Sequence, residues 1–248
     1  MSELFQELVD GKGRVAILID PDKNTKKSAF KSHIQTLISA KPDLFFVGGS
    51  TGNRAQTENC VNCLKEETQI PVVLFPGNSE QFSAKADAIL FLSLLTSRNP
   101  KYIIEEQIKS ASEVYLSGIQ TIPTGYILID GGTHTSTLQV TQSTPIAQES
   151  LKTILDTALA GTLMGHKALY MDAGSGATTL ISEEIIRTIA PLTQLLIIGG
   201  GLRNISAIKK AHLAGAKVVV IGNQLESDAS FAQEIAAYQE ERHRSLLT

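Results

Sequence analysis

Residues 195–204 read LLIIGGGLRN, and this stretch decides how the rest of the chain is interpreted. Four apolar residues are followed directly by three glycines. A glycine triplet supplies no side chains for packing and raises the entropy cost of ordering the backbone. A tight turn explains one glycine, but three in a row favour a backbone that another group must approach more closely than a Cβ would allow. We therefore interpret the stretch as a buried strand that ends at a ligand site.

Seven further short apolar runs occur along the chain, and helical patterns separate most of them. Nearly continuous apolar runs are typical of parallel strands that are covered on both faces. The eight expected strands span 14–20, 44–50, 71–77, 88–94, 125–131, 168–174, 195–200 and 217–223. The expected helices span about 26–40, 53–67, 100–116, 148–164, 182–190, 204–214 and 228–242.

The alternation of strands and helices predicts an α/β fold with a single TIM (β/α)₈ barrel domain over residues 1–248. A doubly wound sheet is the alternative, because periodicity alone does not show that the sheet closes. Residues 78–87 are too short and serine-rich for a full helix, so we expect a loop to replace one helix after the third strand. The polar stretch 130–150 is a candidate mobile lid.

Composition and the chain ends exclude several classes of function. The net charge is −3 and aromatic residues make up 5%, which gives no reason to expect nucleic-acid binding. The first residues are too polar for a signal peptide, and Leu4, Phe5, Leu8 and Val9 have the spacing of a short amphipathic cap. No apolar run approaches the ~20 residues of a membrane-spanning helix, so we expect a cytoplasmic protein without a transmembrane segment.

Two cysteines, Cys60 and Cys63, form one C-x-x-C on an expected helix. A zinc or redox site would need a second ligand pair or a suitable turn, and the five histidines lack the spacing of metal ligands. We therefore interpret both cysteines as packing residues and expect no zinc.

Glycine and polar residues collect at the carboxyl ends of the expected strands, where barrel enzymes place their chemistry. The glycines of 199–201 follow the seventh strand, and Gly222 and Asn223 follow the eighth. Bare N–H groups at these two ends, together with a helix N-terminus, favour a phosphate site. Tight turns that need positive φ angles are the structural alternative.

Two other strand ends carry carboxylates. Asp20 and Asp22 follow the first strand, and one or two carboxylates suit Mg²⁺, although an Asp-Pro turn with a helix cap explains them as well. After the sixth strand, YMDAGSGA (170–177) places Tyr170 and Asp172 on one face of the strand, with glycines and Ser175 beyond them. This end combines an acceptor for substrate hydroxyls with an anion-binding backbone.

Seven motifs together resemble the geranylgeranylglyceryl phosphate synthase family. They are LIDPDK (18–23), VGGST (47–51), LFPG (74–77), SRNP (97–100), YMDAGSGA (170–177), IGGGLRN (198–204) and VVVIGN (218–223). The resemblance implies a TIM-barrel prenyltransferase that joins a prenyl diphosphate, geranylgeranyl diphosphate foremost, to the 3-hydroxyl of sn-glycerol 1-phosphate. The products would be an ether-lipid precursor and diphosphate.

The resemblance also implies roles for individual residues. Asp20 and Ser50 would hold Mg²⁺, and Tyr170 and Asp172 would serve catalysis. The glycerol phosphate would be bound by Tyr170, Asp172, Gly174, Ser175, Gly176, Gly200, Gly201, Gly222 and Asn223. Relatives form homo-oligomers, and transient contact with a membrane surface is compatible with the expected chemistry.

This sequence departs from the family pattern at two positions. Asp172 stands where the family usually has the longer Glu, which affects the reach of the carboxylate to the glycerol. Leu18 stands where some members carry a basic residue, which indicates the other branch of the family.

Two other functions stay open at this point. One is a different phosphate-binding barrel enzyme, such as a sugar-phosphate isomerase or epimerase, which would need neither Mg²⁺ nor an apolar groove. The other is a non-catalytic barrel that binds a phosphorylated ligand. Asp20, Ser50 and Asp172 argue against the second, because phosphate binding alone requires none of them. A prenyl chain would need an apolar groove, which the helix-poor stretch 78–87 could leave open, with Tyr102 either lining its far end or packing in its helix.

Overall fold

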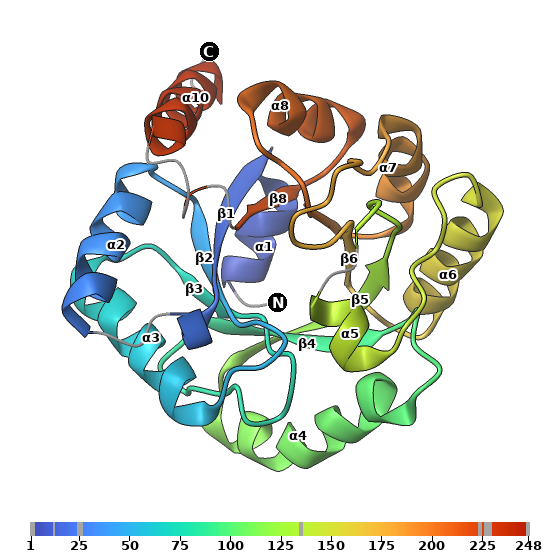
Figure 1. Cartoon of the computed structure of the whole chain (residues 1–248), viewed down its shortest axis with the longest axis horizontal. Coiled ribbons are helices and arrows are strands. Elements are labelled where there is room, and N and C mark those ends of the chain that lie inside the picture. The colour runs from blue at the N-terminus through green and yellow to red at the C-terminus, as the bar shows by residue number, and fades with distance from the viewer. Residues whose placement is uncertain are drawn as a thin grey trace.

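Eight parallel strands form a closed barrel in which each strand lies beside its sequence neighbours (Figure 1). The computed structural model describes residues 3–11, 13–23, 27–133, 136–222, 225 and 230–246. The strands are Arg14–Ile19 (β1), Leu44–Val47 (β2), Val72–Leu74 (β3), Ala88–Leu94 (β4), Gln120–Leu128 (β5), Ala168–Asp172 (β6), Leu195–Gly199 (β7) and Val218–Ile221 (β8). β1 pairs with β8, with Val15 opposite Val219, and this pairing closes the sheet. The predicted TIM barrel is confirmed.

Helices surround the barrel (Figure 1). They are Lys27–Ser39 (α2), Arg54–Glu67 (α3), Glu106–Ser117 (α4), Leu151–Leu163 (α6), Glu183–Ile189 (α7), Ile205–Ala214 (α8) and Ser230–Leu246 (α10). A π-helical turn, Lys101–Glu105 (η2), leads into α4, and short 3₁₀ turns occupy Pro21–Lys23 (η1) and Ala190–Leu192 (η3). Glu3–Asp10 (α1) and Ser136–Thr141 (α5) lie outside this ring and are described below.

Alternate residues of each strand face two different cores. On β7, Leu195 and Ile197 pack inside the barrel, whereas Leu196 and Ile198 pack against the helices. Both faces are buried, which explains why the strands read as continuous apolar runs. The same alternation turns Gly199 towards the barrel interior, at the carboxyl-end mouth.

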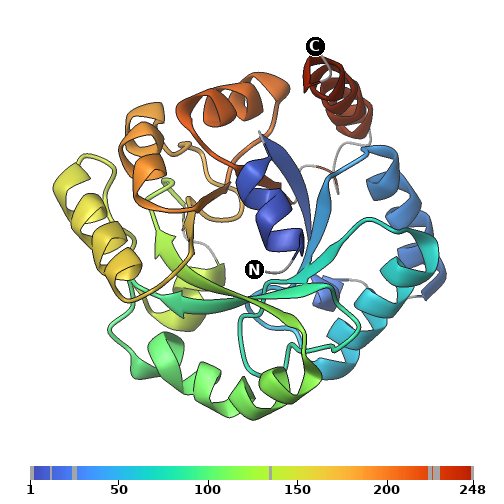
Figure 2. The same cartoon turned by 180° about the vertical axis from the view of Figure 1, so that it is seen from behind.

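The opposite mouth of the barrel is covered by α1, which Figure 2 shows lying across it. Phe5 and Leu8 are each 4% exposed and pack in the inner core. The predicted amphipathic cap is thus confirmed, and it leaves the carboxyl-end mouth for a site.

The connection from β3 to β4 contains no helix, as the sequence predicts. In place of an apolar helix face, the connection buries Phe82 and Ala86 in the outer core. The connection therefore seals the barrel with individual side chains.

β5 begins at Gln120, five residues before the start expected from the sequence. Pro123 makes this part look unlike a strand, because proline cannot donate a hydrogen bond to a ladder. The Pro123 carbonyl accepts from the Lys167 amide, and β6 begins only at Ala168, opposite Thr124. The missing donor therefore lies at the margin of the β5–β6 pairing, where it interrupts little.

The long polar insertion after β5 contains α5. Ile146 forms a bridge with Ile129 at the end of β5, and the Tyr102 hydroxyl donates to the Val140 carbonyl at 2.9 Å. These contacts hold α5 at the carboxyl-end mouth.

Candidate active site

A cavity of about 630 Å³ opens at the carboxyl ends of the strands. It brings together most of the residues predicted from the strand ends. Those that line it are Asp20, Ser50, Tyr170, Asp172, Ser175, Gly176, Gly200, Gly201 and Gly222. Asn223, also predicted, lies outside the described residues.

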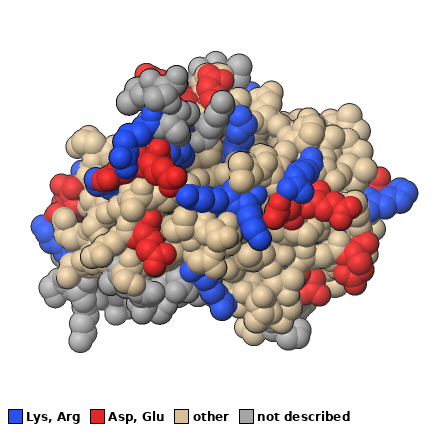
Figure 3. All heavy atoms as spheres, turned by 90° about the horizontal axis from the view of Figure 1, so that it is seen from above, with Lys and Arg blue, Asp and Glu red and all other residues tan. Residues whose placement is uncertain are grey.

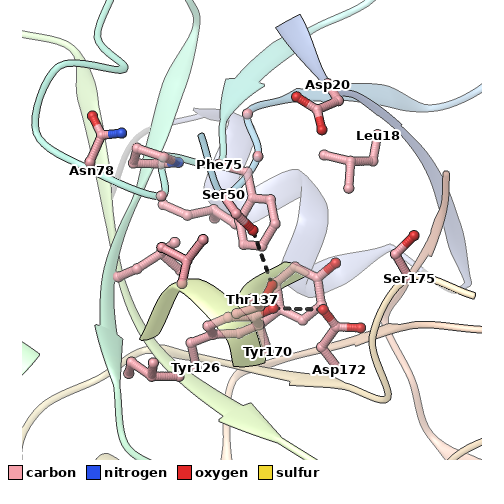
Figure 4. A pocket seen from close by; sticks show the side chains of 18 of the residues that line it. Leu18, Asp20, Ser50, Phe75, Asn78, Tyr126, Thr137, Tyr170, Asp172 and Ser175 are labelled. Atoms are coloured by element: carbon pink, nitrogen blue, oxygen red, sulfur yellow. Dashed lines mark hydrogen bonds between the residues drawn. The ribbon is translucent and has the colours of Figure 1, made fainter. Parts of the chain in front are cut away.

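Asp172, the last residue of β6, is 9% exposed and has a hydrogen-bond partner on each carboxylate oxygen. The Tyr126 hydroxyl donates to Oδ2 at 2.6 Å (Figure 4), and the Gly174 amide donates to Oδ1 at 2.7 Å. Burial raises the pKa of Asp172, and these two hydrogen bonds offset only part of the increase. The result is a carboxylate that is held in one orientation and is more basic than an ordinary aspartate.

Tyr170 is 1% exposed and packs among aromatic rings at the centre of the barrel mouth. Its ring stacks on Phe75 with centroids 5.0 Å apart and meets Tyr126 edge-on at 5.2 Å. Burial, with Asp172 nearby, raises the pKa of Tyr170 well above its usual range. Its hydroxyl therefore stays protonated and can serve as a hydrogen-bond donor but not as a base.

The glycine triplet after β7 meets three different neighbours. A Cβ on Gly199 would lie 2.6 Å from the Tyr170 hydroxyl, so this glycine makes room for the tyrosine. A Cβ on Gly200 would lie 2.6 Å from the Gly174 amide nitrogen, and its φ of +89° favours glycine independently. Gly201, in contrast, has side-chain and carbonyl neighbours at 3.0 Å or more. The sequence suggested that another group comes close to the backbone at this triplet. At Gly199 and Gly200 that group is part of the protein itself, namely Tyr170 and the loop after β6.

Two of the remaining glycines predicted near the phosphate, Gly174 and Gly222, differ in their surroundings. The Gly174 amide donates to Asp172, and Gly174 is buried beneath the cavity lining. Gly222 faces open space, since a Cβ there would meet only the Leu18 Cβ, at 4.0 Å. The missing side chain of Gly222 thus leaves room for a ligand, as does that of Gly176, where a Cβ would meet nothing within 4 Å.

Asp20 and Ser50 occupy another side of the cavity (Figure 4). Gly49 packs on the Asp20 carboxylate, where a Cβ would lie 2.6 Å from Oδ1, and the Asp22 amide donates to the same oxygen at 3.4 Å. Asp22 also accepts a hydrogen bond from the Thr51 hydroxyl. The loop after β2 is thereby held against the end of β1.

Thr137 of α5 is a site residue that the sequence did not reveal. Its hydroxyl lies 3.3 Å from that of Ser50 (Figure 4). A hydrogen bond from the Thr137 side chain also acts on Tyr126. Thr137 thus connects the Ser50 side of the cavity with the tyrosine that holds Asp172. A lone threonine in a polar insertion gives no sequence signal for this role, because the contact requires the insertion to fold back over the mouth.

The cavity continues outward between β4 and the η2–α4 segment. Its wall there includes Phe91, Leu92 and Tyr102, together with the polar Gln107 and Ser110. Glu106 accepts a hydrogen bond from the Ser79 amide at 2.8 Å and joins α4 to the helix-free connection. An apolar groove therefore leads away from the polar centre, on the side where the helix is missing.

Cys60 and Cys63 lie elsewhere, in the outer core. Both are buried thiols, and burial raises the pKa of Cys60 above its usual range. They are packing residues of α3, as the sequence predicts.

The surface and the helices add two observations. On the face that Figure 3 views, basic and acidic side chains are interspersed. Within the described part of the chain, no helix is both long and apolar enough to cross a membrane.

Comparison with known proteins gives one consistent result. A family model described as the PcrB family matches residues 11–241. The geranylgeranylglyceryl phosphate synthase of Zunongwangia profunda is 44% identical over 214 residues, which cover 86% of this chain and 91% of that protein. The protein of the same name from Flavobacterium johnsoniae is 40% identical over 231 residues, with coverages of 92% and 94%.

A solved structure is also similar over nearly the whole chain. It is the (S)-3-O-geranylgeranylglyceryl phosphate synthase of Thermoplasma acidophilum in complex with its substrate sn-glycerol-1-phosphate. The TM-score is 0.86, the identity is 29%, and the match covers 95% of this chain and 96% of that one.

Proposed function

Because the chain belongs to the PcrB family, we propose that it is a prenyltransferase that joins a prenyl diphosphate to the 3-hydroxyl of sn-glycerol 1-phosphate. One observation carries the proposal: a single cavity joins a glycine-lined polar end, with the buried Asp172, to an apolar groove. A substrate with a small phosphorylated head and a second substrate with a long apolar tail match these two ends. Geranylgeranyl diphosphate is the expected donor.

The glycerol phosphate fits the ends of β6, β7 and β8. Ser175, Gly176, Gly201 and Gly222 line the cavity there, and backbone N–H groups near glycines bind phosphate oxygens well. The glycerol then extends from this end towards Asp172. A phosphate at the Gly222 side thus directs the 3-hydroxyl at the carboxylate.

The reaction forms a C–O bond and breaks another. The 3-hydroxyl oxygen of the glycerol attacks C1 of the prenyl group, and the bond from C1 to the diphosphate oxygen breaks with its electron pair leaving on diphosphate. The hydroxyl proton passes to the Asp172 carboxylate and from there to water. The raised pKa of Asp172 favours this proton transfer, because a general base works best when its pKa approaches the working pH.

The residues at the Asp20 side fit a magnesium ion. Among the described residues no three His, Cys, Asp or Glu side chains form a metal-binding group, but Mg²⁺ uses one or two carboxylates together with phosphate oxygens and waters. Asp20 and Ser50 supply such hard oxygen donors in one cavity. When bound, Mg²⁺ would neutralise charge on the leaving diphosphate.

The charge of the cavity lining supports a cation requirement. Its described residues include the acidic Asp20, Asp22, Glu106 and Asp172 but, of the basic residues, Arg203 alone. Two phosphorylated substrates would add further negative charge. Arg203 is already engaged, since it donates to the Gly176 carbonyl at 2.9 Å.

A transfer assay tests the proposal directly. Radiolabelled sn-glycerol 1-phosphate is incubated with Mg²⁺ and prenyl diphosphates of several chain lengths, and the label that enters an organic phase is counted. We expect label to enter the organic phase with at least one long prenyl diphosphate. Asp172→Asn serves as the negative control and should extract little label. Label that stays in the aqueous phase with every donor would contradict the function and favour an isomerase or epimerase.

We also propose that the protein forms homo-oligomers. Ile104, Ile108 and Leu116 on the η2–α4 segment are 50%, 65% and 82% exposed, which is unusual for large apolar side chains on one helix. Light scattering coupled to size-exclusion chromatography measures the mass in solution. A mass equal to one chain of 26.7 kDa at micromolar concentration would contradict this proposal.

A further inference from the structure

Gln81 is a glutamine in the helix-free connection between β3 and β4, and it is 1% exposed. Its Oε1 accepts hydrogen bonds from the amides of Gly49, at 3.3 Å, and Gly77, at 3.1 Å. Its Nε2 donates to the carbonyls of Gly49, at 2.9 Å, and Gly52, at 3.1 Å. The amide group therefore uses both donors and both acceptor positions on backbone groups.

These bonds join the loops that follow β2 and β3. Ladder pairing between the two strands ends at Val47 and Leu74, followed by one bond from the Phe75 amide to the Val47 carbonyl. Beyond that point the backbones touch directly, since a Cβ on Gly77 would lie 2.3 Å from the Gly49 carbonyl oxygen. Gln81 thus continues the strand pairing with a side chain.

Gly49, at the centre of this arrangement, lies between two residues of the site. It precedes Ser50 in the chain, and it packs on the Asp20 carboxylate closely enough to exclude a Cβ. A displacement of Gly49 would therefore change the position of Ser50 and the packing of Asp20 together.

We propose that Gln81 is a positioning residue that fixes Gly49 and so sets the placement of Asp20 and Ser50 at the diphosphate end of the cavity. This inference rests on the proposed function, because it assigns that end to Mg²⁺ and diphosphate. Gln81 itself lies beneath the cavity lining and acts through the loop. Outer residues of this kind typically change metal affinity by about 10–100-fold when they are replaced.

A second glutamine provides a matched control. Gln148 also joins two loops, since its Nε2 donates to the Asp130 carbonyl at 3.1 Å and the Leu180 carbonyl at 2.9 Å, and its Oε1 accepts from the Ser182 amide at 3.0 Å. It is absent from the cavity lining and bonds to neither the β2 nor the β3 loop. Gln148→Met therefore removes a comparable set of loop bonds at a distance from Asp20.

The experiment compares wild type, Gln81→Met and Gln148→Met by calorimetry with two probes, magnesium pyrophosphate and sn-glycerol 1-phosphate. We expect Gln81→Met to weaken magnesium pyrophosphate binding by about tenfold, while glycerol phosphate binding changes less than about twofold. Gln148→Met should bind magnesium pyrophosphate as wild type does, even if its melting temperature falls. Hydrogen exchange of the Gly49 amide should be faster in Gln81→Met only.

Several results would overturn the proposal. Unchanged magnesium pyrophosphate binding by Gln81→Met would do so, as would an equal loss for both probes. If Gln81→Met does not fold, Gln81→Glu takes its place. The glutamate keeps the length and an acceptor oxygen but directs an anion at two carbonyls. We expect the same selective loss of magnesium pyrophosphate binding. A wild type that binds magnesium pyrophosphate but transfers no prenyl group would contradict the proposed function and leave this comparison interpretable, because calorimetry needs no turnover.

Discussion

Asp172 shows how one position on a strand sets the chemistry of a side chain. Its place at the end of β6 buries it, and Tyr126 and Gly174 then fix both of its oxygens. Burial keeps the pKa raised even with these two partners present. The orientation that the proposed proton transfer needs therefore comes from the two hydrogen bonds, and the raised pKa comes from burial, which the same bonds partly offset.

Removing the charge of Asp172 should slow the reaction without weakening the binding of glycerol phosphate. Asp172→Asn keeps the size but loses the base, and loss of a general base typically costs about 10²–10⁴ in rate. Because its amide has one oxygen for two donors, one of the bonds to Tyr126 and Gly174 is lost as well. We expect kcat to fall by that range while glycerol phosphate affinity, measured by calorimetry, changes little. If Asp172→Asn kept the wild-type kcat, the role of the carboxylate would be structural only. Asp172→Glu restores the family's usual residue and should stay active.

Removing the partner of Asp172 should change the pH dependence instead. With Asp172 as the proposed base, transfer requires the deprotonated carboxylate, so we expect activity to be lost as the pH falls through the pKa of Asp172. The Tyr126 hydroxyl stabilises the charged form, so Tyr126→Phe raises this pKa further and moves the acidic limb of the kcat/KM profile to higher pH. Tyr102→Phe, at the same cavity but bonded to Val140, is the control and should leave the limb in place. An unshifted limb in Tyr126→Phe would contradict Asp172 as the base.

Two glycines near the proposed phosphate should respond differently to a methyl group. Gly222→Ala introduces a Cβ into open space, so we expect an unchanged melting temperature and weaker glycerol phosphate binding. Gly200→Ala brings a Cβ against the Gly174 amide at a positive φ, so it should destabilise the fold by about 1–3 kcal/mol. Thermal unfolding and calorimetry measure both effects. If Gly222→Ala binds glycerol phosphate as tightly as wild type does, the phosphate does not bind at this end of the barrel.

The sequence predicted which residues would gather at the site but not what each would contact. Asp172, Ser175 and Gly222 line the cavity as their strand ends imply. The fit of Tyr170 beside Gly199 was not predictable, because it depends on the alignment of β6 with β7 rather than on either motif. For the same reason the Gly174 amide was assigned to phosphate, whereas it donates to Asp172.

Among the elements, α10 is attached to the barrel by a buried polar network. Asp43 accepts hydrogen bonds from Arg242 at 2.6 Å, Gln239 at 2.7 Å and the Val15 amide at 2.8 Å. Burial would raise the pKa of Asp43, but these partners outweigh it and lower the pKa. Next to this network, His212 of α8 lies 2.7 Å from the Tyr238 hydroxyl of α10 and 3.1 Å from the Arg14 carbonyl.

This attachment should make the fold sensitive to mild acid. Nε2 of His212 must donate to the carbonyl, and in the neutral ring that the lowered pKa favours, Nδ1 accepts from the Tyr238 hydroxyl. Burial lowers the pKa of His212 to about 4, whereas an unfolded histidine titrates near 6.5. The unfolded chain therefore binds the proton first, and the free energy of unfolding decreases as the pH falls from 6.5 towards 4, by up to about 3 kcal/mol.

Urea unfolding at pH 7.5, 5.5 and 4.5 measures this decrease, and Asp43 stays ionised across the range because its pKa is lowered. His212→Gln keeps a polar side chain that does not titrate, so its stability should depend less on pH. Equal slopes in wild type and His212→Gln would show that other groups cause the pH dependence.

Elements with strong periodicity were predictable, and their exceptions have local causes. The apolar runs located all eight strands, because both faces of each strand are buried. The early start of β5 was missed, since Pro123 resembles a strand breaker unless the start of β6 is known. α5 was missed because its six residues carry no helical pattern, and contacts of Tyr102 and Thr137 hold it in place.

For the whole molecule, the balance of charge in the cavity predicts a dependence on a divalent cation. Lys109 already pairs with Glu106, so Arg203 is left, among the described lining residues, to balance Asp20, Asp22, Asp172 and two anionic substrates. Excess EDTA should abolish prenyl transfer, and added Mg²⁺ should restore it. Asp20→Ala should lose transfer in the same assay while it retains the wild-type circular dichroism spectrum. Full turnover in EDTA, or by Asp20→Ala, would exclude the metal role.

The missing helix between β3 and β4 has an evolutionary consequence. The residues that would handle the glycerol head lie at the ends of β6, β7 and β8, whereas the groove for the tail is walled by β4 and α4. Selection on lipid length and selection on head-group chemistry therefore act on separate sets of positions. In a prenyltransferase of the proposed kind, substitutions along β4 and α4 can therefore change the accepted chain length while the ends of β6, β7 and β8 keep the head-group chemistry.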